Sequence, residues 1–285
     1  MHARSAEATL RPMHAGDLDA VHRLVVQWSW PHRRDDCALL IELGDGVVAM
    51  DAAWQVVGVG MWWGFGADVG TVGMVMVAPE HQGRGIGHAL MTALIAAAGP
   101  RALMLNATAA AVPLYERRGF RPVGLVRQHQ GQVVGPAVVC FASRKVRPAL
   151  PTDRDALSML DAVAFGADRT ALIARLVADG AAWVMDGGAG LDGFAIVRTF
   201  GRGQLIGPVV AANEDDAIAL IATAARTSQA GLLRVDIPAH AQRLAAWLTE
   251  AGLPAIDTVT SMVRGTWPQA QARAQRFGLA LQALG

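Results

Sequence analysis

The sequence predicts an α/β protein built from two tandem copies of one fold, each a mixed, mostly antiparallel sheet flanked by helices. With 285 residues, the chain is too long for one ordinary small domain. Its 53% hydrophobic and 17% charged residues can bury a sizeable core, which excludes a disordered chain. Strand patterns occur both in hairpins and across helices, so each sheet should be mixed. Segments of the first half also recur, in the same order, in the second half.

Four pairs of segments carry this repeat. In the first pair, an apolar strand meets Arg-Pro, and an acidic residue then precedes an amphipathic helix as a candidate N-cap. The other pairs are an apolar strand after a glycine, a later apolar strand, and a helix that ends in glycine. The four pairs are Leu10–Met13 with Val146–Ala149 (including Asp17 and Asp153), Gly73–Ala78 with Gly207–Ala211, Leu103–Asn106 with Leu232–Asp236, and Gly119–Phe120 with Gly252–Leu253. Four matches in one order indicate a duplication.

The boundary between the copies falls near Ser143 to Lys145. We therefore expect domains over residues 1–144 and 145–265 and a helical tail over 266–285, in which Gln269 to Leu284 forms a terminal helix. Two closing strands should end the first copy. Its other elements are expected as strands near 9–13, 47–51, 54–63, 70–77 and 101–106, and helices near 17–29, 33–42, 84–98 and 109–118.

Charge and cysteine content narrow the class of protein. The formal net charge is +1, and no basic run could follow a phosphate backbone, so nucleic-acid binding is not expected. Cys37 and Cys140 are too few for a disulfide framework and lack metal-site spacing, so no metal is expected. Residues 1–10 lack a signal-peptide core, and no window offers about 18 uncharged apolar residues. We expect a soluble, cytoplasmic protein that does not bind membranes.

The stretch from Val75 to His88 carries the clearest chemical signal. An apolar strand ends at Val77, Pro79 stops strand pairing, and a glycine-rich turn opens an alanine-rich helix. Glycines let backbone approach a ligand closely, and the first helical N–H groups lack internal partners, so the pattern predicts a pyrophosphate cradle. It is not a P-loop, because His88 follows Gly87 where Lys-Ser/Thr is required. It also lacks the tight turn and the later acidic residue of a dinucleotide fingerprint.

The run Gln82-Gly83-Arg84-Gly85-Ile86-Gly87 resembles the Q/R-x-x-G-x-G/A signature of the GNAT N-acetyltransferase superfamily. Asn106 after the next strand and the run Leu114–Phe120 also fit, and the resemblance covers roughly residues 9–143. It implies acetyl-CoA as co-substrate and an amine on a small molecule, peptide or protein as acceptor. It also implies that Val75, Met76 and Val77 contact the acetyl-pantetheine arm, that the loop holds the diphosphate, and that Asn106 reaches a pantetheine amide. The loop residues are Gln82, Gly83, Arg84, Gly85, Ile86, Gly87 and His88.

Tyr115, the only tyrosine, stands where the resemblance places the acid that protonates the departing CoA thiolate. A phenol with a pKa near 10 suits that task. The alternative is that Tyr115 only packs between helix and sheet. An amide near Val77 could bind the thioester oxygen as it gains charge. The resemblance implies direct attack by the amine without an acyl-enzyme, and both cysteines are interpreted as core residues.

The residue that removes the amine proton is not singled out by the sequence. The candidates are His32, Asp68, Glu80 and His81, of which His32 lies in the segment that the resemblance assigns to the acceptor site. A surface or structural role for His32 is an equal alternative. Four tryptophans, Trp28, Trp30, Trp62 and Trp63, could line an acceptor pocket or belong to the core.

The second copy lacks the glycine loop. Acidic Glu214, Asp215 and Asp216 stand at the corresponding helix start, where they would repel a diphosphate, and Leu248 takes the place of Tyr115. We expect a degenerate domain that supports the acceptor site or a homodimer. An alternative function for the whole chain is an acyl-CoA sensor or interaction protein without turnover.

Overall fold

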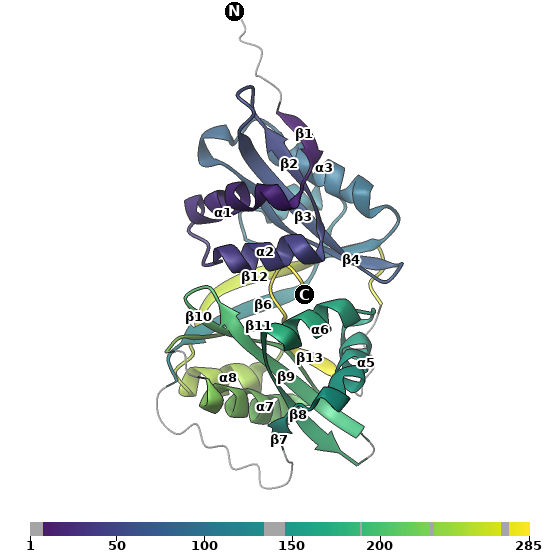
Figure 1. The fold of residues 1–285 in the computed structure, drawn as a ribbon, viewed down its shortest axis with the longest axis vertical. Helices are drawn as coiled ribbons and strands as arrows, with labels where there is room; N and C mark the ends of the chain where they lie inside the picture. The colour runs from purple at the N-terminus through teal and green to yellow at the C-terminus, as the bar shows by residue number, and fades with distance from the viewer. Residues whose placement is uncertain (1–7, 134–145, 189, 229–230, 269–273) are drawn as a thin grey trace, which may run out of the picture. The chain divides into compact units, whose positions relative to one another are not determined.

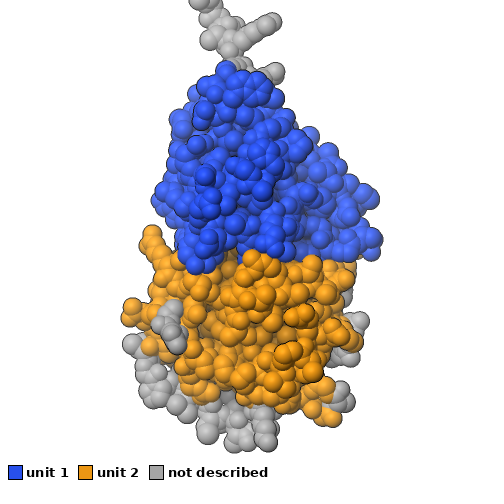
Figure 2. Space-filling view, viewed as in Figure 1, with its two compact units in different colours: residues 1–103 blue, residues 104–285 orange. Residues whose placement is uncertain are grey.

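The computed structural model describes residues 8–133, 146–188, 190–228, 231–268 and 274–285. The chain divides into two compact units (Figures 1 and 2). Unit 1 comprises residues 1–103 and unit 2 residues 104–285. These units do not coincide with the two copies of the sequence repeat, because a strand of the first copy pairs with strands of the second copy in unit 2.

Unit 1 is an antiparallel sheet in the order β1-β2-β3-β4 with helices on both faces. Gly58 and Gly60 of β3 face helix α3, and an added Cβ at Gly60 would lie 2.7 Å from Leu94 of that helix. Trp63 has the opposite parity along the strand and donates from Nε1 to the Leu40 carbonyl of α2 at 3.0 Å. The elements are β1 Thr9–Pro12, α1 Leu18–Gln27, α2 Arg34–Leu43, β2 Asp45–Met50, β3 Val56–Phe65, β4 Val69–Val77 and α3 Ile86–Ala98.

Unit 2 contains a mixed sheet in the order β12-β6-β11-β10-β9-β8-β7, with β13 paired to β10. Strand β5 (Ala102–Ala107) crosses the division between the units. The other elements of unit 2 are α4 Val112–Glu116, β6 Arg121–Gly131, β7 Val146–Pro148, α5 Arg154–Phe165, α6 Thr170–Asp179, β8 Gly180–Gly187, β9 Gly190–Phe200, β10 Gly203–Ala211, α7 Glu214–Thr227, β11 Leu233–Pro238, α8 Gln242–Glu250, β12 Ala255–Arg264 and β13 Gln275–Gly278.

Strand β6 explains why the units differ from the copies. It belongs to the first copy by sequence, yet it pairs antiparallel with both β11 and β12 of the second copy. The division between the compact units, after residue 103, is therefore a different division from the one between the two copies, whose boundary near residue 144 stays a prediction. The second predicted closing strand of the first copy, and Cys140, lie outside the described residues.

The predicted terminal helix is wrong over its described residues. Gln275–Gly278 form strand β13, and the chain then makes a turn in which Leu284 N donates to the Leu281 carbonyl at 2.9 Å. The edge of β10 supplies backbone hydrogen-bond partners to this segment, and these override its helical propensity.

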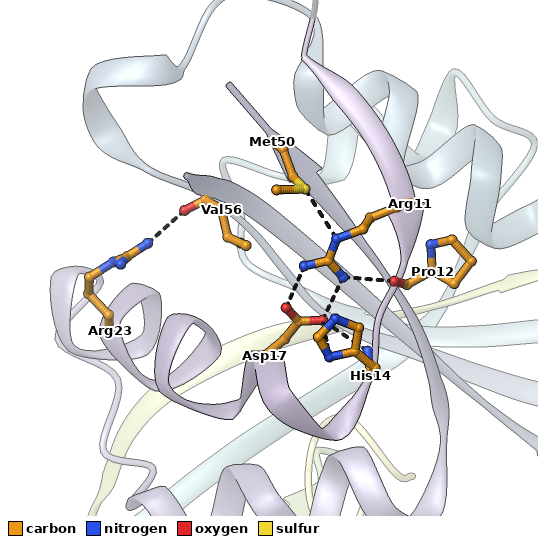
Figure 3. Close-up of polar contacts among 7 residues, drawn as sticks. All are labelled: Arg11, Pro12, His14, Asp17, Arg23, Met50 and Val56. Carbon is orange, nitrogen blue, oxygen red and sulfur yellow. Dashed lines mark hydrogen bonds and ion pairs between the residues drawn. The ribbon is translucent and has the colours of Figure 1, made fainter. Parts of the chain in front are cut away.

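The repeat is confirmed at the level of side chains. Arg11 donates two hydrogen bonds to the Asp17 carboxylate, at 2.8 and 2.6 Å, and the His14 amide donates a third at 2.9 Å (Figure 3). In the second copy, Arg147 and the Leu150 amide bind Asp153 in the same way, at 2.7, 3.1 and 2.7 Å. Neither aspartate makes the predicted side-chain N-cap, because its carboxylate is turned to the arginine.

The environment of Asp17 fixes its charge. Burial opposes ionisation of this carboxyl, but the hydrogen bonds from Arg11 and His14 outweigh it, so the pKa of Asp17 lies below its ordinary value. A carboxyl whose pKa is lowered in the folded state stabilises the fold at pH values above its ordinary, unfolded-state pKa. That stability is lost as the pH falls through the lowered value.

We predict that Asp17→Asn lowers the free energy of unfolding at pH 7 by about 1.5 to 3 kcal/mol, the usual worth of hydrogen bonds to a charged group. Its stability should also fall less steeply than that of the parent below pH 4. Urea denaturation at both pH values measures this. Asp19→Asn is the matched control, because the Asp19 side chain is 81% exposed whereas that of Asp17 is 5% exposed. Equal losses in the two variants would contradict the account.

Candidate functional site in the glycine loop of unit 1

Strand β4 contains a β-bulge just before its last residues. Val59 of β3 faces Met76 whereas Met61 faces Gly73, so β4 carries one extra residue between these pairs. Met74 takes up the bulge with a φ of 54°, a left-handed conformation that a buried methionine seldom adopts. Backbone strain of this kind clusters at functional sites. The bulge re-aims Val75 to Val77, which the sequence analysis assigned to the cofactor arm.

A glycine loop connects β4 to α3. A 3-10 turn spans Pro79–His81, and Gly83 and Gly85 then adopt left-handed φ values of 72° and 79°. An added Cβ would meet nothing within 4 Å at either position, so the space on that side of each glycine is open. Other residue types rarely hold these angles, and an approaching anion could touch the main chain there.

Helix α3 begins directly after the loop, with Gly85 as its N-cap. Its first helical hydrogen bond is donated by Ala89 to the Gly85 carbonyl at 3.0 Å, so the amides of Ile86 and Gly87 lie in the turn that lacks carbonyl partners within the helix. The Arg84 side chain folds back and donates to the Glu80 carbonyl at 3.1 Å. A diphosphate fits this arrangement through backbone amides and the helix dipole.

Trp28, at the end of α1, reaches the end of β4. Its Nε1 donates to the Val77 carbonyl at 3.0 Å, while 38% of the residue is exposed. The next amide, of Ala78, bonds to Val57 of β3, so the Val77 carbonyl lies on the edge of β4 away from β3. His32 follows on the same connection, with its ring 5.8 Å from that of Trp30. The α1–α2 connection is thereby brought to the expected thioester end of β4.

The structure places the other residues that the sequence offered as a base, pocket wall or nucleophile in different environments. Asp68 precedes the first residue of β4, on the order of 25 to 30 Å from Val77 at about 3.3 Å per residue, which is too far for a base at that end. Glu80 and His81 lie in the loop, with His81 near Asp51 at 3.9 Å. Trp62 and Trp63 are buried in the core. Cys37 is also buried, which raises its pKa to about 12 and makes it a poor nucleophile.

Asn106 and Tyr115 belong to unit 2, and Asn106 already has protein partners there. Its Nδ2 donates to the Gln282 carbonyl at 2.7 Å, and its Oδ1 accepts from Ser261 Oγ at 2.5 Å. An asparagine amide can make four hydrogen bonds, so capacity for one more donor and one more acceptor contact is left. No local sequence pattern indicates these partners, which lie more than 150 residues away along the chain.

Tyr115 is buried in α4 and packs edge-on against Phe120 at 6.0 Å. Burial raises the pKa of Tyr115 to about 12, although nearby Arg118 opposes the shift. The Tyr115 carbonyl accepts from Phe120 N at 3.2 Å, and the Leu248 carbonyl accepts from Leu253 N at 2.8 Å in α8. The matching turns support the alignment of Leu248 with Tyr115.

In the second copy, the chain itself occupies the strand edge that corresponds to the predicted cofactor position of the first copy. Strand β10 bulges at Gly207 and Pro208, the counterparts of Gly73 and Met74. Before the bulge it pairs with β11, and after it Val209–Ala211 pair with β13. Leu279 N then donates to the Asp236 carbonyl of β11 at 2.9 Å, so the C-terminal segment lies between the two strands.

Acidic residues open α7 of the second copy, as the sequence predicted. Glu214 accepts from Leu244 N at 2.7 Å, and Asp215 forms an ion pair with Arg243. The negative charge at this helix start is therefore held by protein partners. None of the helices in the described part of the chain is long and apolar enough to cross a membrane.

Comparisons with known proteins agree with this architecture. Family models described as "Acetyltransferase (GNAT) domain" match residues 40–136 and 157–278. The chain is 27% identical over 251 residues to the uncharacterized N-acetyltransferase YitH of Bacillus subtilis (strain 168), covering 84% of this chain and 86% of that protein.

Two solved structures share the fold over nearly the whole chain. A putative acetyltransferase from Pyrococcus horikoshii superposes with a TM-score of 0.80 at 18% identity, covering 100% of this chain and 98% of that one. A tandem GNAT protein from the clavulanic acid biosynthesis pathway gives 0.64 at 16% identity, with coverages of 92% and 100%. The duplicated bulge, the glycine loop and the two family matches lead to one conclusion: the chain belongs to the GNAT acetyltransferases and carries two GNAT domains in tandem.

Proposed function

We propose that the first copy transfers the acetyl group of acetyl-CoA to a primary amine and that the second copy binds no CoA. The loop geometry supports this most directly, because Gly83 and Gly85 hold left-handed angles beside open space and lead into a helix start. We assign the diphosphate to Gln82–His88 and the acetyl-pantetheine arm to Val75–Val77 and Asn106. CoA supplies an activated thioester, and the protein residues bind it and move protons.

The reaction we propose is direct acyl transfer. The amine nitrogen attacks the thioester carbon, a C–N bond forms, and the C–S bond breaks. An amide near Val77 stabilises the negative charge on the carbonyl oxygen. The amine loses one proton, which we assign to His32, and the departing sulfur gains one from Tyr115. His32 is chosen because it lies four residues beyond Trp28, whose indole contacts the Val77 carbonyl.

The raised pKa of Tyr115 bears on its role. A phenol with a pKa of about 12 is fully protonated at neutral pH, so the proton is always present. Transfer to a thiolate of ordinary basicity, near pKa 8.5, would be unfavourable by about 5 kcal/mol. Burial raises the pKa of a thiol as well, as at Cys37, where it reaches about 12. The acid and the thiolate stay matched if the sulfur is as deeply buried as the tyrosine.

We predict that Gly85→Asp weakens acetyl-CoA binding on the order of 100-fold, since it strains the loop and puts a carboxylate where backbone meets diphosphate. Gly66→Asp is the matched control: Gly66 also has a left-handed φ, 61°, beside open space, but in the β3–β4 turn. Calorimetry on the full chain measures both affinities, and circular dichroism checks folding. If Gly85→Asp folds and binds as tightly as Gly66→Asp, the ligand lies elsewhere.

Replacing Tyr115 by Phe keeps the ring packing and removes only the proton. We expect kcat to fall by about 10²- to 10⁴-fold with little change in acetyl-CoA affinity. The rate is measured as CoA release with an acceptor found by screening amines, under conditions where chemistry limits turnover. A parental rate would make Tyr115 a packing residue, and a collapse of affinity would assign its hydroxyl to cofactor binding. Tight binding of acetyl-CoA without turnover on any amine would favour a sensor.

A further inference from the structure

The Trp28 indole lies against the edge of β4 that faces away from β3. Its Nε1 donates to the Val77 carbonyl at 3.0 Å. The N–H and C=O groups of one strand residue point to the same edge, so the Val77 amide also faces the side on which the indole lies. The amide is within about 3.3 Å of that carbonyl along the strand, the rise of one residue. The proposed reaction places the thioester oxygen at this amide but gives the indole no role.

The backbone of Trp28 is held by a closed turn at the end of α1. Ser29 N donates to the Val26 carbonyl at 2.9 Å. Trp30 N donates to the Val25 carbonyl at 3.0 Å, which completes the pair of hydrogen bonds of a Schellman motif. Ser29 has a φ of 56° at the position where this motif usually has glycine. Strained residues of this kind cluster at functional sites, and here the strain fixes the direction in which the chain leaves Trp28.

Helix α1 is itself anchored to the core of unit 1. Leu24 and Val25 are fully buried. Arg23 donates to the carbonyl of Val56, the first residue of β3, at 2.8 Å (Figure 3). A buried helix face, a closed turn and a hydrogen bond from the ring thus hold the Trp28 side chain from three directions. The indole is a wall of fixed position beside the end of β4.

We propose that Trp28 limits the length of the acyl group that the first copy accepts, so that acetyl fits and longer chains are hindered. This inference rests on the proposed function, because it takes the thioester oxygen to bind near Val77 and the amine proton to pass to His32. Trp28 and His32 belong to the same connection, so the acyl group has to lie between that connection and the strand edge. A fixed apolar wall typically discriminates one methylene by about 10- to 200-fold.

Two acyl-CoA thioesters test the proposal on the full chain without an acceptor. Acetyl-CoA and butyryl-CoA share the CoA portion and differ by two methylenes. We expect calorimetry to show that the parent binds acetyl-CoA more tightly by about 10-fold or more. Trp28→Ala should bring the ratio of the two affinities to about one. Trp28→Phe removes the indole N–H but keeps most of the bulk, so it should retain part of the preference.

Trp54→Ala serves as the control, because Trp54 is 72% exposed in the turn between β2 and β3. Its ratio should equal that of the parent, since any general change in CoA affinity cancels. Circular dichroism checks that each variant folds. Trp28→Leu, a smaller truncation that keeps an apolar contact, replaces Trp28→Ala if alanine unfolds the chain, and it should lower the ratio as well.

The outcomes separate this proposal from the proposed function. A parental ratio in both truncated variants of Trp28, or a parent that binds the two thioesters equally, would overturn the acyl limit and leave the proposed transferase in place. An equal loss of affinity for both thioesters in Trp28→Ala would make Trp28 a general cofactor contact and would also overturn the limit. Binding of neither thioester to the parent would overturn the proposed function, and this inference with it.

Discussion

The bulge in the strand before the glycine loop is the constraint on which the two copies depend. One extra residue, at Met74 or at Pro208, bends the strand and breaks its regular pairing. The backbone groups beyond the bulge still need hydrogen-bond partners. The second copy satisfies them with its own chain, through β13 and Leu279. In the first copy, we assign the corresponding residues Val75–Val77 to the pantetheine arm.

The two copies therefore differ in how they complete the same strand edge. In the second copy the C-terminal segment lies directly against this edge, because a Cβ on Gly207 would come within 1.9 Å of the Leu279 carbonyl oxygen. The C-terminal segment is fixed further by Arg169, which donates to the carbonyls of Leu284 and Gly285 at 2.9 and 2.8 Å. In the same segment, the Gln282 carbonyl accepts a hydrogen bond from the Asn106 side chain. The C-terminal segment that pairs with β10 of the second copy thus also binds Asn106, which we assign to the pantetheine arm of the cofactor in the first copy.

Local pattern was enough to predict much of this fold. Helix α3, the strand before it and the left-handed glycines follow from the Gln82–Gly87 run, because they depend on residues close in sequence. The Arg-Pro and Asp repeat likewise identified the duplication that Arg11 and Arg147 confirm. The C-terminal strand was missed, since the pattern of Gln269–Leu284 favours a helix and only the distant edge of β10 makes it a strand. The partners of Asn106 also depend on distant contacts that no local pattern records.

Hydrogen exchange with and without acetyl-CoA tests the central claim most directly, because it follows both strand edges in one sample. The account predicts that acetyl-CoA slows exchange at the amides of Val75–Val77 and of the Gln82–His88 loop. The amides of Val209–Ala211 and Leu279 should already exchange slowly without ligand and should not change. Protection that appears in the second copy, or that leaves the glycine loop of the first copy untouched, would contradict it.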